Sequence, residues 1–165
     1  MIRAIGCTEA VGNDAPEAPG NAIFSEVPVE KLSSRIHTDF MADNLLTLAN
    51  AGQVSPTVAH VLDSLMLHPV LTMKGGKIVL ERFCVGERVA AWEAFLNGEA
   101  KKMKKADKRV LFFTYGGIPQ DMLAELKRMV ARKLSFEKVI VVQATPSIFA
   151  NCGPMSFGVH YMDVG

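Results

Sequence analysis

Two β-rich runs on either side of Gly75-Gly76 constrain the fold of this chain most strongly. The first run extends from Pro69 to Lys74 and the second from Lys77 to Cys84. Glycine accepts the positive φ angles that a two-residue hairpin turn requires. The pattern therefore predicts an antiparallel hairpin, and so a sheet at the centre of the fold.

Helical and extended patterns alternate after the hairpin. Helices are predicted over 87–103 and 120–134, and strands over 109–115, 138–145 and 155–162, with the strand over 138–145 expected to be buried. A buried stripe is expected on the first helix, formed by Val89, Ala91, Trp92, Phe95 and Leu96. The predicted fold class is α/β, more closely α+β, with a single sheet that contains antiparallel pairs and is covered by helices.

The residues before the hairpin divide into two parts. Residues 1–28 are expected to form an irregular N-terminal segment or linker, because Gly, Pro and Asn interrupt every periodic pattern there. The organised domain is expected over 29–165. Its predicted start consists of a helix over 29–36, a strand over 37–42, a helix over 44–50 and a helix after Ser55-Pro56 whose apolar face includes Leu65 and Met66.

Composition limits the possible functions. With 165 residues, of which 49% are hydrophobic, and a net charge of +1, we expect one soluble domain and no dedicated nucleic-acid surface. The absence of a long apolar run and of a secretory signal pattern leads us to expect no transmembrane segment and a cytoplasmic location. The three scattered cysteines are expected to be reduced, and the histidine spacing matches no metal motif.

Three local features allow alternative interpretations. Cys152, beside a Gly-Pro turn, could be a nucleophile assisted by His160, which would make the protein a small cysteine hydrolase. Gly116-Gly117 before a helix either cradles a phosphate or forms a simple turn. The basic stretch Lys101–Arg109 is either a solvated helix end or a docking surface for anionic lipid or a partner protein.

Three segments, taken in order, resemble the DegV family of bacterial fatty-acid-binding proteins. Residues 43–55 resemble its Leu-x-x-Leu-x-x-x-Gly-Arg-Ile-Ser element, residues 68–79 its Lys-Pro-Ile-Leu hairpin, and residues 150–159 its His-Thr-Gly-Pro-Gly segment. The resemblance covers about residues 29–162 and only the C-terminal domain of the family. It implies a missing N-terminal α/β domain, or a homodimer in its place.

The resemblance also implies a function and a site. The expected protein is a non-catalytic domain without a cofactor or metal, which binds a long-chain fatty acid and would present the acyl chain to a fatty acid kinase. The predicted ligand-binding residues are Gln53, Asn151, Cys152, Gly153 and Ser156.

The sequence departs from the family at several of the head-group positions. Asn151 stands where the family has His, Gln53 where it has Arg, and Met155 where it has a second Gly. Amides donate neutral hydrogen bonds, which are weaker than charge-assisted ones. The head-group site is therefore weakened, adapted to a less charged ligand, or lost. In the last case the domain would serve interaction or regulation instead.

Overall fold

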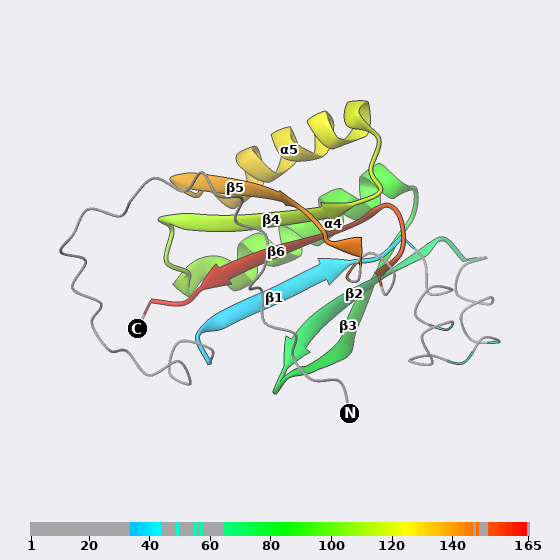
Figure 1. The fold of residues 1–165 in the computed structure, drawn as a ribbon, viewed down its shortest axis with the longest axis horizontal. Helices are drawn as coiled ribbons and strands as arrows, with labels where there is room; N and C mark the ends of the chain where they lie inside the picture. Colours follow the sequence, from blue (N-terminus) through cyan, green and yellow to red (C-terminus); the bar gives the residue numbers. More distant parts are fainter. Residues whose placement is uncertain are drawn as a thin grey trace. The chain divides into compact units, whose positions relative to one another are not determined.

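The structure of the protein is a computed structural model that describes residues 34–43, 65–146 and 152–164, together with the single residues 49, 55, 57 and 148. Residues Arg35–Gly165 form one compact unit. Its centre is a six-stranded sheet in the order β3-β2-β1-β6-β4-β5 (Figure 1). The strands are β1 (Ile36–Met41), β2 (Leu67–Lys74), β3 (Lys77–Val85), β4 (Val110–Gly116), β5 (Lys138–Gln143) and β6 (Ser156–Met162).

The last strand of the chain lies in the middle of this sheet. β6 pairs antiparallel with β1 on one side and with β4 on the other. β4 and β5 are parallel, joined through helix α5. The sheet therefore joins a hairpin half, β1-β2-β3, to a β4-α5-β5 half through the single strand β6.

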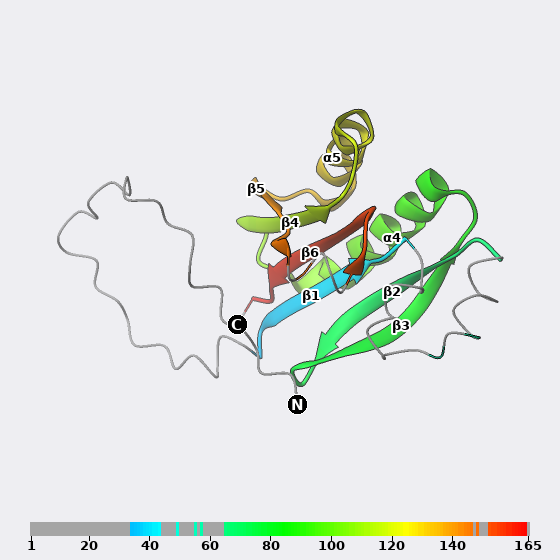
Figure 2. The same ribbon diagram turned by 45° about the vertical axis from the view of Figure 1, so that its right-hand side comes forward.

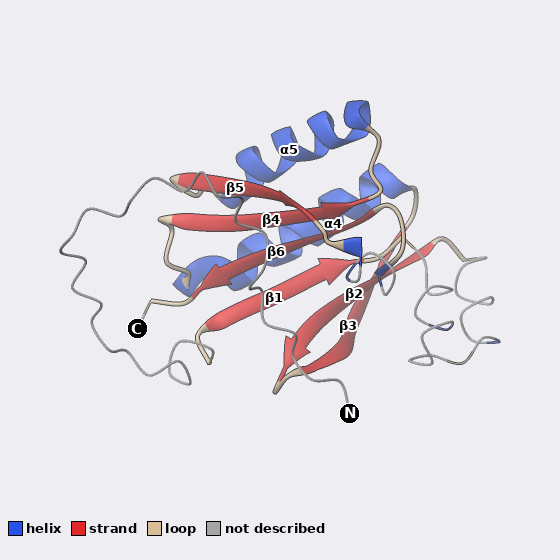
Figure 3. Ribbon diagram, in the orientation of Figure 1, coloured by secondary structure: helices blue, strands red, loops and turns tan. Residues whose placement is uncertain are grey.

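Helices α4 (Arg88–Lys102) and α5 (Gln120–Leu134) both cover one face of the sheet (Figures 2 and 3). A short 3-10 helix, Met103–Lys105, follows α4. The core between helices and sheet centres on Phe157 of β6, which meets the rings of Trp92 and Phe95 edge-to-face at centroid distances of 5.8 and 5.2 Å. Such aromatic contacts contribute about 0.5–1.5 kcal/mol beyond the burial of area.

The fold class predicted from the sequence is confirmed, and so is the hairpin. Gly75 and Gly76 both have positive φ, at 55° and 74°, as a two-residue turn between β2 and β3 requires. The two helices and the strands after the hairpin occur within a few residues of their predicted bounds. Helix α5 buries an apolar side with helical spacing, at Leu123, Leu126, Met129 and Val130.

Four local predictions were wrong. Val89 is 41% exposed, because it lies in the first turn of α4 and faces away from the sheet. The strand over 138–145 ends at Gln143 and forms an edge of the sheet, so Val141 and Val142 are exposed. Leu65 and Met66 lie in an exposed turn and not on a helix. Ile36 begins β1, although it was predicted to end a helix.

The predicted helix over 44–50 lies outside the described residues except for Ala49.

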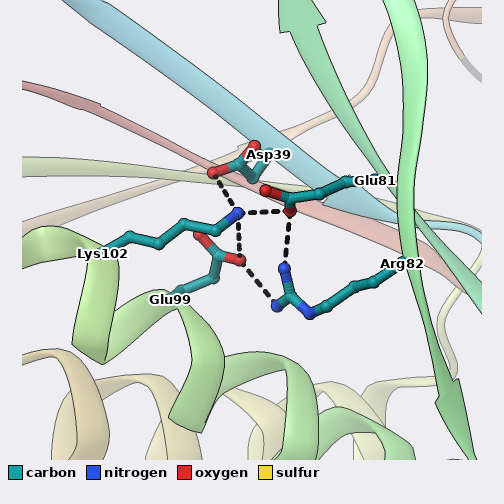
Figure 4. A network of polar contacts seen from close by, with 5 residues as sticks. All are labelled: Asp39, Glu81, Arg82, Glu99 and Lys102. Atoms are coloured by element: carbon teal, nitrogen blue, oxygen red, sulfur yellow. Dashed lines mark hydrogen bonds and ion pairs between the residues drawn. The ribbon is translucent and has the colours of Figure 1, made fainter.

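A buried cluster of charges ties α4 to the sheet (Figure 4). Glu99 of α4, whose side chain is fully buried, accepts a hydrogen bond of 2.9 Å from Arg82 of β3. Lys102, one turn further along α4, contacts Asp39 of β1 at 3.2 Å, Glu99 at 3.1 Å and also Glu81. The cluster thus joins β1, β3 and α4.

A β-bulge and a glycine make room for this cluster. Val70 pairs with Arg82 and Leu71 with Leu80, so Glu81 is the extra residue in β3. Consecutive residues of a regular strand face opposite sides, whereas here Glu81 and Arg82 both contribute to one cluster. On α4, a Cβ at Gly98 would lie 2.5 Å from Arg82 Nη2. A glycine inside a helix costs about 1 kcal/mol relative to alanine, and here it admits the guanidinium.

The two buried carboxyl groups respond to this environment in opposite directions. Burial, followed by the neighbouring Asp39, raises the pKa of Glu99 to about 7, against the effect of Arg82 and Lys102. Burial alone would raise the pKa of Asp39 as well, but hydrogen bonds from Glu99 and Thr72 and the charge of Lys102 lower it. When both groups are ionised, Glu99 Oε2 has no hydrogen-bond donor among the described residues. A proton on Glu99 lets the two carboxyl groups form a hydrogen bond.

This arrangement predicts that stability declines toward alkaline pH. The folded pKa of Glu99 lies above the usual value of 4.5, so its stabilising contribution is complete below pH 4.5 and is lost as the pH rises through about 7. We expect the free energy of unfolding to fall by roughly 1–3 kcal/mol between pH 5 and 8. Glu99→Gln mimics the protonated side chain and should flatten this decline in urea denaturation curves. Glu125→Gln, on the exposed side of α5, is the matched control; identical pH profiles for wild type and Glu99→Gln would contradict the assignment.

Candidate functional site

The face of the sheet opposite α4 and α5, which we call the open face, carries mainly apolar side chains. Strand pairing places them in cross-strand rows. One row contains Phe40, Gly158 and Thr114, and the next contains Thr38, His160 and Phe112. A further row pairs Ile36 with Met162. Ile36 is 50% exposed, Phe112 45% and Val142 of β5 41%. An apolar surface of this kind favours a lipid or another apolar partner.

Three polar side chains form a hydrogen-bonded trio in the middle of the open face. His160 Nε2 lies 2.8 Å from Thr114 Oγ1, and His160 Nδ1 lies 3.1 Å from Thr38 Oγ1. Burial lowers the pKa of His160, with the charge of Asp39 acting in the opposite direction. At neutral pH the imidazole is therefore uncharged, and the open face carries no charge at its centre.

A cavity of about 350 Å³ hollows the open face at the end where β4 begins and β6 ends. Ile36, Phe112 and Met162 contribute apolar walls, and His160 closes it on one side. Arg109 lies at its edge, with Nε 3.0 Å from both carboxylate oxygens of Asp107. The side-chain and backbone hydrogen bonds from Arg109 lower the pKa of Asp107 to about 2. The arginine charge is thus already paired, which suits this end to an apolar group.

The turn before β6 lies at the opposite end of the open face. Gly153 has a φ of 76° and Met155 a φ of 59°, a conformation that favours glycine. Met155 thus keeps the backbone conformation that a glycine would adopt more easily. Ser156 is buried and donates its hydroxyl hydrogen to the carbonyl oxygen of Gly153 at 2.7 Å. That hydrogen closes the turn and is not available to a ligand.

Charged groups surround a second cavity, of about 310 Å³, at this same end of the sheet. Asp43, which follows β1, accepts two hydrogen bonds from Arg88 at 2.9 and 3.1 Å. His68 connects the carbonyl oxygens of Asp43 and Gly86. Arg88, like Arg109 at the other end, is therefore paired with a carboxylate.

The predicted site residues are only partly within the described chain. Cys152, Gly153 and Ser156 lie together in the turn before β6, whereas Gln53 and Asn151 lie outside the described residues. Burial raises the pKa of the Cys152 thiol, and both ring nitrogens of His160 face threonine hydroxyls. This geometry does not fit an activated thiolate with His160 as its base.

Sequence reasoning missed the open face and its trio. The alternation of side chains in β4 and β6 shows that Phe112 and Thr114 share a face, but it does not show which face the helices cover. The two interpretations of the basic stretch also missed one of its residues. Lys102 points into the buried cluster, whereas Lys101, Lys104 and Lys105 are exposed. Within the described residues, no group of His, Cys, Asp and Glu could hold a metal ion, and no helix is long and apolar enough to span a membrane.

Comparison with known proteins identifies the family. A family model described as an uncharacterised protein of the DegV family matches residues 22–163, so this chain belongs to the DegV family. A comparison with curated proteins gives no match.

Solved structures of the same family share the fold. A fatty-acid-binding DegV protein of Thermus thermophilus is 27% identical, with a TM-score of 0.64 over 82% of this chain and 48% of its own. A DegV protein of Eubacterium eligens loaded with heptadecanoic acid is 14% identical, with a TM-score of 0.66 and the same coverage. The fatty acid kinase B3 protein of Streptococcus pneumoniae, loaded with linoleic acid, is 10% identical, with a TM-score of 0.66 over 82% of this chain and 47% of its own. The chain thus spans about half the length of these relatives.

The environment of Cys152 leads to a direct chemical prediction. Because burial raises its pKa, the thiol should react with iodoacetamide at pH 7.5 several-fold more slowly than free cysteine, whose pKa is about 8.5. The rate should rise steeply above pH 9. Peptide mapping by mass spectrometry measures both rates, and labelling faster than free cysteine at neutral pH would instead support a catalytic thiolate.

Proposed function

We propose that this chain is a non-catalytic fatty-acid-binding domain that holds the acyl chain on its open face. The observation that carries the proposal is the apolar open face of a DegV-family sheet, with exposed Phe112 and Ile36 beside a cavity of suitable size. Each methylene removed from water contributes about 0.8 kcal/mol. Support also comes from the fatty acids named for the related structures of Thermus thermophilus and Eubacterium eligens.

The head group in this proposal lies at the Gly153 turn and the tail extends toward Phe112. In this proposal the turn offers backbone N-H groups to the head group, and Gln53, Asn151 and Cys152 contribute there. Ser156 contributes through the shape of the turn, since its hydroxyl hydrogen is already donated. The opposite end suits the tail, because Arg109 is neutralised by Asp107.

A charged substitution on the open face tests this proposal. Phe112→Asp should abolish the thermal stabilisation that octadecanoic acid gives the wild-type protein, because an acyl chain cannot cover a carboxylate without a large desolvation cost. Val89→Asp, which places the same charge at an exposed apolar position of α4, should retain this stabilisation. Differential scanning fluorimetry measures the shift, and extraction with mass spectrometry identifies copurified lipid. Wild-type protein without copurified lipid and without stabilisation would refute fatty acid binding.

A second candidate is an interaction or regulatory domain that has lost its head-group site. The observation in its favour is that both arginines near the ends of the open face are paired with carboxylates, Arg88 with Asp43 and Arg109 with Asp107. A fatty acid carboxylate at either end would then meet an arginine whose charge is already paired. The lipid experiment above distinguishes the two candidates.

As a finer proposal, the bound acyl chain is presented to a fatty acid kinase, in line with the name of the Streptococcus pneumoniae relative. The phosphoryl-transfer chemistry would then belong to the kinase. Addition of this protein to a purified fatty acid kinase, ATP and octadecanoic acid should increase ATP consumption in proportion to the loaded protein. Equal ATP consumption with and without the protein would contradict this role.

A further inference from the structure

The polar trio on the open face has three hydrogens but only two internal hydrogen bonds, so one hydrogen is left over. A neutral imidazole carries one N-H donor and one acceptor nitrogen. One threonine hydroxyl therefore donates to His160, and the other accepts from it. The accepting hydroxyl keeps its own hydrogen, and neither Thr38 nor Thr114 has another hydrogen-bonding partner in the described part of the chain.

This spare hydrogen lies on the open face, where a bound ligand could reach it. Thr38, Thr114 and His160 are all half-buried, and their row neighbour Phe112 is exposed. Gly158, next to Thr114 in β4, carries no side chain to cover the hydroxyl. A plain hydrocarbon chain would cover the trio and leave the O-H without a partner, which weakens binding. An oxygen on the ligand at this point would remove that cost.

The register of β6 gives the position of that oxygen along the ligand. Gly158, which pairs with Thr114, lies two residues after Ser156 in β6. His160, which pairs with Thr38, lies four residues after Ser156. At about 3.3 Å per residue, the trio lies roughly 7–13 Å from the turn. A C-C bond of about 1.5 Å advances an extended chain by about 1.3 Å, so this span corresponds to roughly the sixth to tenth carbon.

We propose that the open face selects an acyl ligand that carries a hydroxyl or oxo oxygen near the middle of its chain, with the Thr38-His160-Thr114 trio as the specificity determinant. This inference rests on the proposed fatty acid binding and adds the chemical class of the ligand. Whichever threonine accepts from the imidazole donates its hydrogen to the ligand oxygen. The uncharged state of His160 suits a neutral oxygen better than a carboxylate.

The test compares the dissociation constants of octadecanoic, 10-hydroxyoctadecanoic and 2-hydroxyoctadecanoic acid for the delipidated full chain by isothermal titration calorimetry. For the wild-type protein, the dissociation constant of the 10-hydroxy acid should be at least about five-fold lower than that of octadecanoic acid. This ratio is typical of one neutral hydrogen bond. The 2-hydroxy acid should show no such gain. Equal or weaker binding of the 10-hydroxy acid would overturn the inference, whereas no binding of any of the three acids would refute the proposed function itself.

Substitutions at the trio provide the second measurement. In Thr38→Val/His160→Leu/Thr114→Val, which removes all three hydrogen donors of the trio, the ratio of the dissociation constants of octadecanoic and 10-hydroxyoctadecanoic acid should fall toward one. Thr72→Val, the same change on the opposite face of neighbouring β2, is the matched control and should keep the wild-type ratio. Circular dichroism confirms that each variant is folded. A ratio in this triple variant that equals the wild-type ratio would exclude the trio as the determinant.

Discussion

The pairing of β6 with both β1 and β4 is the interaction on which the rest of the structure depends. No other strand pairing among the described residues joins the hairpin half of the sheet to the β4-α5-β5 half. β6 also supplies Phe157 to the core and His160 to the open face. Its pairing with β1 is close, since a Cβ at Gly158 would lie 2.9 Å from Phe40 Cβ. Any larger residue at Gly158 would force β1 to shift relative to β6.

The two faces of the sheet separate two kinds of polar chemistry. Beneath α4, the buried carboxyl groups of Asp39 and Glu99 are compensated by the partly exposed Lys102, and these contacts hold helix and sheet together. On the open face, the polar groups are hydroxyls and a neutral imidazole. A neutral trio costs less to cover with hydrocarbon than an ion pair would. This distribution is what an apolar ligand on the open face requires.

Much of the fold follows from local sequence, whereas the site does not. The Gly75-Gly76 turn and the helical periodicity of 120–134 act over a few residues, and both were predictable. The order of the segments also indicated the family. Whether Phe112 and Thr114 lie on the open face or beneath the helices depends on the side of the sheet on which α4 and α5 pack. The alternation of residues within a strand does not predict that side. The buried cluster depends on the bulge at Glu81, a change of pairing between distant residues that makes two consecutive side chains converge.

The two edges of the sheet differ in how they would meet another molecule. Along β3, the bulge and charged side chains such as Lys77 and Glu81 oppose the addition of a further strand. β5 is short and regular, with no charged side chain between Lys138 and Gln143. Its outward-facing backbone groups form a template of high β-propensity. At high protein concentration, we expect aggregation to begin at the β5 edge. The substitution Val141→Lys would oppose it by placing a charge on this edge.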